Sequence, residues 1–205
     1  MRIITSLVLL LTIAVPAFPV TKIAGPTSII VTPKAPQFTD AERHAELARR
    51  RAAVAAKMAD KSMMILFSAE PRLYTNDVDY VFRQENNLFY LTGLKQKNAT
   101  LVITKDGAKV SETLFIPKRV PAQETWNGKM YSREEVTAIS GLKTIVDSSE
   151  VTAFLDAVKA KGPFASKDGK VAISAAPESI YMLLPDGERD GDGLREFAQE
   201  NQFAR

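Results

Sequence analysis

The chain has 205 residues, of which 45% are hydrophobic and 25% charged, and its net charge is +3. This balance indicates a globular protein with one sizeable domain rather than a disordered or fibrous chain. The lack of cysteine excludes thiolate catalysis and cysteine zinc sites, and the single histidine, His44, excludes a histidine-rich metal centre.

The first twenty residues are typical of a secretory signal peptide. Arg2 precedes an apolar run, and small residues around Ala17 provide a cleavage position. Pro16 and Pro19 interrupt the run, which is too short for a membrane span, with an uncleaved anchor as the alternative. We therefore expect an exported protein, periplasmic or secreted, with a signal peptide at residues 1–20 and no stable membrane span after cleavage.

A linker is expected next, at residues 21–38. Residues 19–38 contain four prolines and no helical period, which indicates an extended tether. The predicted domain occupies residues 39–185. Residues 186–205 are expected to begin the connection to a further domain.

A helix is predicted from Thr39 or Asp40, either of which serves as its cap, because alanine, arginine and glutamate dominate the sequence up to residue 60. Asp40 lies one turn before His44, but a cap and a surface histidine explain this pair better than a metal site. Basic residues here alternate with alanine instead of stacking aromatics, so we interpret them as a solvated helix face and expect no nucleic-acid partner. Membrane-surface or phosphate contact is the alternative for these residues, which are Arg43, Arg49, Arg50, Arg51 and Lys57.

Short apolar runs then alternate with amphipathic segments. Residues 62–69 are predicted as a buried strand, and residues 87–94 and 99–106 as further strands. Asp106 and Gly107 supply turn chemistry that leads into a strand at residues 109–118.

The second half continues the alternation, with a capping box of Ser132 and Glu135 as its clearest signal. The elements predicted here are a helix at 132–140, a strand at 142–147, a helix at 148–161 capped by Ser148 or Ser149 and ended by Gly162-Pro163, a strand at 170–176 and a helix from 192 onwards. This order predicts an α/β, three-layer domain with a mixed central β-sheet flanked by helices.

Two carboxylates, Asp77 and Asp79, are the first candidate metal ligands. On an extended segment they share a face, and such a pair can hold Mg²⁺ or Mn²⁺. Capping or pairing with Arg83 explains them better.

A second carboxylate run, residues 186–193, resembles a calcium-binding loop in its spacing. The twelfth position, which requires a bidentate glutamate, is Phe197, so we interpret the run as a solvated turn. The sequence also lacks a phosphate-binding glycine loop and a serine nucleophile motif. A complete active site is therefore not recognisable from the residues alone.

One ordered set of residues stands out in the middle of the chain: Asp77, Tyr80, Phe82, Arg83 and Gln84, then Phe89-Tyr90-Leu91 before Thr92-Gly93, then Pro117 and Arg119, and finally Glu124, Trp126 and Gly128. In order and spacing, this set is similar to the amino-terminal domain of the Xaa-Pro aminopeptidase (aminopeptidase P) and creatinase family. The resemblance covers most of residues 39–185.

The resemblance implies a two-domain enzyme, whose carboxy-terminal "pita-bread" metallopeptidase domain lies on the same longer chain or on a separate one. That domain holds a dinuclear site, usually of manganese, with two Asp, one His and two Glu ligands. It removes the residue preceding proline from peptide amino termini. No position here matches those ligands, so we assign this chain no catalytic residue, no metal ligand and no cofactor of its own.

The resemblance also implies a supporting role in oligomerisation and at the substrate entrance. Phe89, Tyr90 and Trp126 are the candidates for the entrance or for subunit contact, with core packing as the alternative for Phe89 and Tyr90 and an inter-strand anchor as the alternative for Trp126. The structural motif comprises Asp77, Asp79, Tyr80, Arg83, Gln84, Gly93, Glu124 and Gly128.

The expected function is that of the non-catalytic amino-terminal domain of an exported, manganese-dependent Xaa-Pro aminopeptidase. Its expected partners are the catalytic domain, peptide substrates and further copies in a homo-oligomer. Whether this chain itself counts as an enzyme is left open. The alternative is a stand-alone peptide- or protein-binding module without catalysis.

Overall fold

The computed structural model describes residues 34, 37–174, 176–184 and 198–204. The chain divides into two units, Met1–Pro36 and Gln37–Arg205, and in the first unit only Lys34 is described. The predicted signal peptide, most of the predicted linker and the carboxylate run at 186–193 therefore lie outside the described residues. Within the described ranges, no helix combines the length and apolar character needed to cross a bilayer.

A five-stranded mixed sheet forms the centre of the second unit, in the order β6-β5-β4-β1-β9. Strands β1, β4 and β5 pair antiparallel, whereas β6 pairs parallel to β5 and β9 parallel to β1. The strands are β1 (Ser62–Phe67), β4 (Thr100–Asp106), β5 (Lys109–Ile116), β6 (Ile145–Asp147) and β9 (Ser179–Tyr181). The predicted strands at 62–69, 99–106, 109–118 and 142–147 are confirmed.

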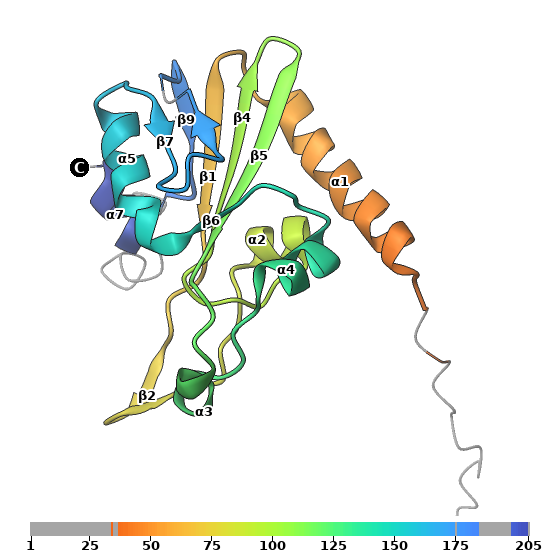
Figure 1. Ribbon diagram of the computed structural model, residues 1–205, viewed down its shortest axis with the longest axis vertical. Coiled ribbons are helices and arrows are strands. Elements are labelled where there is room, and N and C mark those ends of the chain that lie inside the picture. Colours follow the sequence, from red (N-terminus) through yellow and green to blue (C-terminus); the bar gives the residue numbers. More distant parts are fainter. Residues whose placement is uncertain (1–33, 35–36, 175, 185–197, 205) are drawn as a thin grey trace, which may run out of the picture. The chain divides into compact units, whose positions relative to one another are not determined.

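Helices cover both faces of this sheet (Figure 1). On one face lie α1 (Asp40–Lys57), α2 (Asn86–Thr92) and α4 (Arg133–Ser140), and on the other lie α5 (Val151–Lys159) and α7 (Ala198–Ala204). The predicted three-layer α/β architecture is confirmed.

Strand β1 shows why two cores form, because all six of its residues are buried. Successive side chains of a strand point to opposite faces, so Met64 and Leu66 join the core under α1, while Ile65 and Phe67 join the core under α5. In the second core Phe115, Phe154 and Phe164 pack ring against ring, with centroids 5.2–6.0 Å apart.

Shorter elements connect these layers. They are β2 (Leu73–Thr75) and β3 (Val78–Asp79), which form a separate hairpin, β7 (Phe164–Ala165) and β8 (Ala172–Ile173), which form another pair, the helix α3 (Glu124–Asn127), and the 3₁₀ turns η1 (Pro121–Gln123) and η2 (Ser148–Glu150). The strand predicted at 170–176 is thus reduced to two residues.

Local capping chemistry sets most helix starts. Thr39 and Glu42 form a capping box at α1, and Ser132 forms the predicted box with Glu135 at α4. The predicted cap for the next helix is wrong, because the Asp147 side chain accepts a hydrogen bond from the amide of Ser149 and a 3₁₀ turn precedes α5.

The predicted strand at 87–94 is also wrong, since this segment is helix α2. The Glu85 side chain accepts hydrogen bonds from the first helical amides, and Gly93 ends the helix with a left-handed φ of 71°. Leu88, Leu91 and Thr92 are its buried residues, a spacing of three and four that suits a helix. Two strong caps therefore outweigh the strand preference of the aromatic residues between them.

Candidate functional site

Arg51 is the residue that departs most from expectation, because its side chain is 3% exposed. Its Nη1 donates to the carbonyl oxygens of Leu91 (3.0 Å) and Ser140 (3.2 Å), and its Nε lies 3.0 Å from Oε2 of Glu112. The interpretation of the α1 basic residues as a solvated face is therefore wrong at Arg51. This arginine ties α1 to α2, α4 and strand β5.

The two helix ends that Arg51 contacts have matching sequences, Leu-Thr-Gly-Leu at 91–94 and Ile-Ser-Gly-Leu at 139–142. In each, the hydroxyl donates to the carbonyl four residues earlier and accepts from the amide two residues later. Each glycine takes a left-handed φ, of 71° and 73°. The last carbonyls of a helix carry partial negative charge, so a buried guanidinium satisfies both ends.

Other α1 side chains reach the same helix ends. His44 Nε2 lies 2.7 Å from the carbonyl oxygen of Ala138, and Arg50 donates to the carbonyl oxygen of Tyr90 at 3.0 Å. Asp40 pairs with Arg43 instead of sharing a ligand with His44. These contacts give the basic side chains a structural task at the carboxyl ends of α2 and α4.

Ion pairing along α1 also fixes its outer face. The hydrogen bonds from Arg49 and then Arg50 lower the pKa of Glu46 to about 2. Arg50 in turn stacks on Tyr90, with its guanidinium carbon 4.3 Å from the ring centroid. The pair therefore holds an aromatic ring of α2 against α1.

Gln84 holds the start of α2 in place from inside the domain. It is buried, its Oε1 accepts from the amides of Ala69 and Glu85, and its Nε2 donates to the carbonyl oxygen of Gln96 at 2.8 Å. This one side chain links the exit of β1 to the loops on both sides of α2.

Glu124 organises the loop that carries α3. Arg119 donates to both of its carboxylate oxygens, at 2.6 and 3.3 Å, and this pairing lowers the pKa of Glu124. The helix then ends at Gly128, whose φ of 79° is left-handed. The Arg119–Glu124 pair thus fixes the start of α3, the short helix on which Trp126 lies.

The carboxylates Asp77 and Asp79 lie on the β2–β3 hairpin. Asp79 pairs with Lys97 at 3.7 Å, and Arg83 donates to Asn86 at 3.4 Å, so of the expected alternatives the pairing of Arg83 with Asp79 is not the one formed. Asp77 occupies the tip between the two strands.

Large apolar side chains are exposed on and beside that hairpin. Every residue from 71 to 80 is exposed, and in Figure 1 the hairpin and α3 extend beyond the same end of the sheet. We call the exposed set the apolar end, which comprises Leu73, Tyr74, Val78, Tyr80, Val81, Val120 and Trp126. Exposed patches of this kind mark interaction surfaces.

The three aromatic candidates are all on the surface. Trp126 is 88% exposed, which rules it out as an inter-strand anchor within this chain. Phe89 and Tyr90 are 42% and 52% exposed, so neither is a fully buried core residue. They lie on α2, next to each other, whereas Trp126 lies on α3.

Sequence reasoning missed most of the apolar end. Tyr80 was assigned a structural role, yet its ring is exposed and meets that of Tyr74 edge to face, with centroids 4.9 Å apart. Leu73, Val78 and Val81 were not singled out. Their apolar character among charged residues was the available signal, but it does not distinguish an exposed hairpin from a buried one.

The described residues do not fit a dinuclear metal centre. Among them, no group of three histidine, cysteine, aspartate or glutamate side chains could hold a metal ion. Hydrolytic metal sites collect several such ligands around an open position. We therefore derive no metal-dependent step from the described part of the chain.

Comparison with known proteins relates the chain to one family. The family described as "Aminopeptidase P, N-terminal domain" matches residues 47–163. The chain is 38% identical over 84 residues to a Xaa-Pro aminopeptidase of Haemophilus influenzae, covering 41% of this chain and 20% of that protein.

Solved structures agree in fold. A Bacillus anthracis protein described as an aminopeptidase P superposes with a TM-score of 0.62 at 24% identity, over 78% of this chain and 36% of that one. A zinc-substituted Escherichia coli aminopeptidase P in complex with product gives 0.55 at 20% identity, over 73% and 38%. The chain spans only 20–30% of the length of the first curated relatives.

Proposed function

The chain belongs to the family of aminopeptidase P N-terminal domains, and from this premise we propose that it is the non-catalytic N-terminal domain of an exported, manganese-dependent Xaa-Pro aminopeptidase. In this role it supports oligomerisation and shapes the entrance to a dinuclear metal site on a C-terminal catalytic domain. That catalytic domain removes the residue preceding proline from peptide amino termini.

The observation that carries this proposal is the apolar end. Removing apolar surface from water contributes roughly 25 cal/mol per Å², and this surface is left uncovered by the described residues. The family relatives are several times longer than the match, which gives such a surface a partner. An isolated two-stranded hairpin is marginally stable in water, so β2 and β3 gain most from docking.

Phe89, Tyr90 and Trp126 suit the entrance of such an enzyme. A proline ring favours aromatic walls, and a narrow opening excludes large proteins. Arg50 orients Tyr90, and the Arg119–Glu124 pair orients the loop of Trp126. Rings held in this way can contact a peptide with little loss of side-chain entropy.

The test is reconstitution with a catalytic domain. The chain is mixed with the C-terminal catalytic portion of the Haemophilus influenzae relative, with that enzyme's own N-terminal domain as the positive control. Co-elution in size-exclusion chromatography and a gain in manganese-dependent cleavage of Ala-Pro peptides support the proposal. Cleavage by the pure, manganese-loaded chain alone overturns it, and a monomer that ignores the catalytic portion favours the stand-alone binding module.

A further inference from the structure

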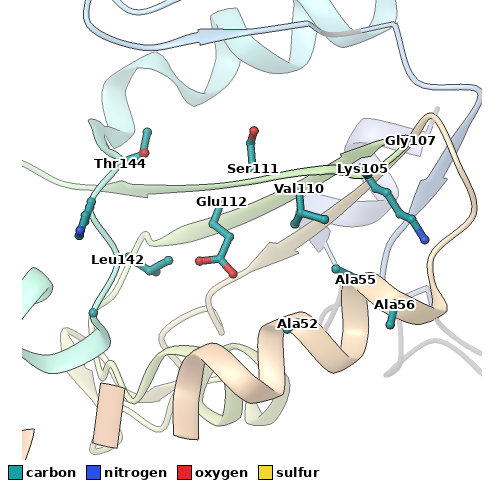
Figure 2. Close-up of a pocket in the computed structure, with 13 residues that line it drawn as sticks. Ala52, Ala55, Ala56, Lys105, Gly107, Val110, Ser111, Glu112, Leu142 and Thr144 are labelled. Carbon is teal, nitrogen blue, oxygen red and sulfur yellow. The ribbon is translucent and has the colours of Figure 1, made fainter. Parts of the chain in front are cut away.

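A groove of about 780 Å³ lies between α1 and the outer half of strand β5, away from the apolar end. Figure 2 shows Val110 and Glu112 pointing from β5 toward α1, while Ser111 points to the opposite face. The helix contributes Ala52, Ala55 and Ala56, whose short side chains leave the space open.

Among the described residues, no strand pairs with the edge of β5 along this groove. Strand β6 pairs only with Leu114–Ile116, and the Leu114 amide donates to the carbonyl of Thr144 at 2.9 Å. Main-chain groups of a strand alternate between its two sides, so those of Glu112 and Val110 face the same edge as those of Leu114. Beyond Thr144, no described strand continues along them.

Such an edge is a template for one more strand. Neighbouring strands lie about 4.8 Å apart, and the groove beside β5 is lined on its other side by residues 141–144, which lead into β6. The Glu112 side chain, which lines the groove, is held in place by its ion pair with Arg51. An incoming strand therefore meets a preformed edge with two amides and two carbonyls to bond.

Charge specifies the incoming strand. Lys105 and Lys143 line the groove, and Lys105 Nζ is held in place by the carbonyl oxygen of Met58 at 2.7 Å. The one carboxylate that lines the groove, Glu112, is neutralised by Arg51. Lys105 lies on β4, opposite Val110, and Asp60 lies near it at the hairpin end, where it accepts from the amide of Gly107. Lys143 belongs to the segment that leads into β6, so it is the lysine on the open side of β5.

We propose that this groove binds an extended, acidic polypeptide segment of a partner protein, which adds to the sheet as a strand beside Val110–Glu112. Main-chain hydrogen bonds supply the affinity, and Lys105 and Lys143 select acidic flanks. Side chains of the segment that face the α1 alanines are small or β-branched. The site is separate from the apolar end and does not depend on the proposed enzyme role.

The experiment uses a blocked peptide, acetyl-Glu-Val-Thr-Val-Glu-amide, and its lysine counterpart, acetyl-Lys-Val-Thr-Val-Lys-amide. Hydrogen exchange of the full chain is followed amide by amide. The acidic peptide is expected to slow exchange at Val110 and Glu112 by about tenfold, with little change at Ser111, whose amide faces β4. Equal protection by the lysine peptide overturns the charge assignment.

Three variants complete the test. Val110→Pro removes only an edge-side donor, which proline tolerates on edge strands, and is expected to abolish protection. Lys143→Glu is expected to weaken binding by about tenfold and remains informative if the proline variant does not fold. Lys118→Glu, the same charge reversal at an exposed lysine that does not line the groove, is the matched control and leaves peptide binding unchanged.

Two outcomes overturn the proposal outright. One is the absence of protection at Val110 and Glu112 at millimolar acidic peptide. The other is strong protection of both amides in the chain without peptide, which would mean that the edge is already covered by this chain or by a second copy.

Discussion

Arg51 and Trp126 reverse the usual distribution of charged and apolar side chains. Arg51 is charged and buried, with its partners on three different elements. Trp126 carries a large, mainly apolar aromatic side chain and is 88% exposed. Charged groups are seldom fully buried unless paired, and large exposed apolar groups in clusters seldom lack a partner.

The contrast distinguishes a region that stabilises the fold, around Arg51, from a region available for binding a partner, the apolar end. Around Arg51, the two helix-end carbonyls accept hydrogen bonds from its Nη1, and the Glu112 carboxylate pairs with the guanidinium, all within the chain. At the apolar end, the described residues provide no cover for the rings. Stability should therefore respond to changes at the first region and binding to changes at the second.

Substituting Arg51 is expected to have the largest effect. Arg51→Ala leaves two helix-end carbonyls and the Glu112 carboxylate without their partner, and we expect a loss of about 3–5 kcal/mol in the free energy of unfolding. Urea denaturation measures it. The matched control is Arg49→Ala, an exposed arginine of the same helix whose ion pair with Glu46 is on the surface, so we expect little change in the urea midpoint. Similar losses in both variants would remove the distinction between the two regions.

Trp126→Ala is the reciprocal change. We expect the free energy of unfolding to stay within about 0.5 kcal/mol of the parent chain. In the reconstituted complex, by contrast, affinity for the catalytic portion should fall about 30-fold, the scale of an interface hot spot. Titration calorimetry measures the affinity for the catalytic portion, and Val110→Pro is the control variant that should keep full affinity. A destabilised chain with unaltered affinity would place Trp126 with the core instead.

The two helix-end glycines test how tightly the cluster is packed. A Cβ at Gly141 would lie 3.1 Å from Cγ of His44, whereas at Gly93 the nearest side-chain atoms are 3.6 Å away. Both positions share left-handed strain, so Gly93→Ala should cost about 1 kcal/mol and Gly141→Ala about 2 kcal/mol. Thermal unfolding measures both. In a His44→Ala background, the losses of stability caused by Gly93→Ala and Gly141→Ala should become more alike. If their difference stays the same, crowding against His44 is not its cause.

Glu200 is a buried carboxylate without the kind of partner that Arg51 has, and it should give the smallest effect. Burial, with the nearby Glu85 and Glu70 charges, raises the pKa of Glu200 from 4.5 to about 7. The folded state then binds more protons than the unfolded state between these values, so its contribution to stability is present below pH 4.5 and lost as the pH rises through 7. Exchange of the α7 amides should quicken from pH 5 to pH 8 beyond the intrinsic rate, and Glu200→Gln should abolish this excess. An excess that persists in the variant would assign it to another group.

Local rules predicted the sheet well. The run at 99–118 contains a clear turn at Asp106-Gly107, and the predicted cap at Thr39 and the predicted capping box of Ser132 depend only on residues three apart. Their outcome does not require knowledge of the rest of the fold. The segment 87–94 failed because its aromatic content favours a strand, while the deciding signals were Glu85 and Gly93 at its borders.

The site was less predictable for a different reason. Burial of Arg51 depends on where the ends of α2 and α4 meet α1, from positions 40 and 89 residues further along the chain. No periodicity within α1 reports this. In the same way, the exposure of Trp126 and of the β2–β3 hairpin is decided by the absence of covering elements around them, which a local pattern does not record.

The shared guanidinium also makes α2 and α4 behave as one cooperative unit. One guanidinium nitrogen of Arg51 donates to the carboxyl ends of both helices. A movement of Arg51 away from one helix end therefore also removes the hydrogen bond at the other. The two helices should thus open together in a single sub-global step, with a common exchange rate. Phe89 and Tyr90 lie on α2, so the rigidity of these rings of the proposed entrance depends on Arg51, a residue of the distant helix α1.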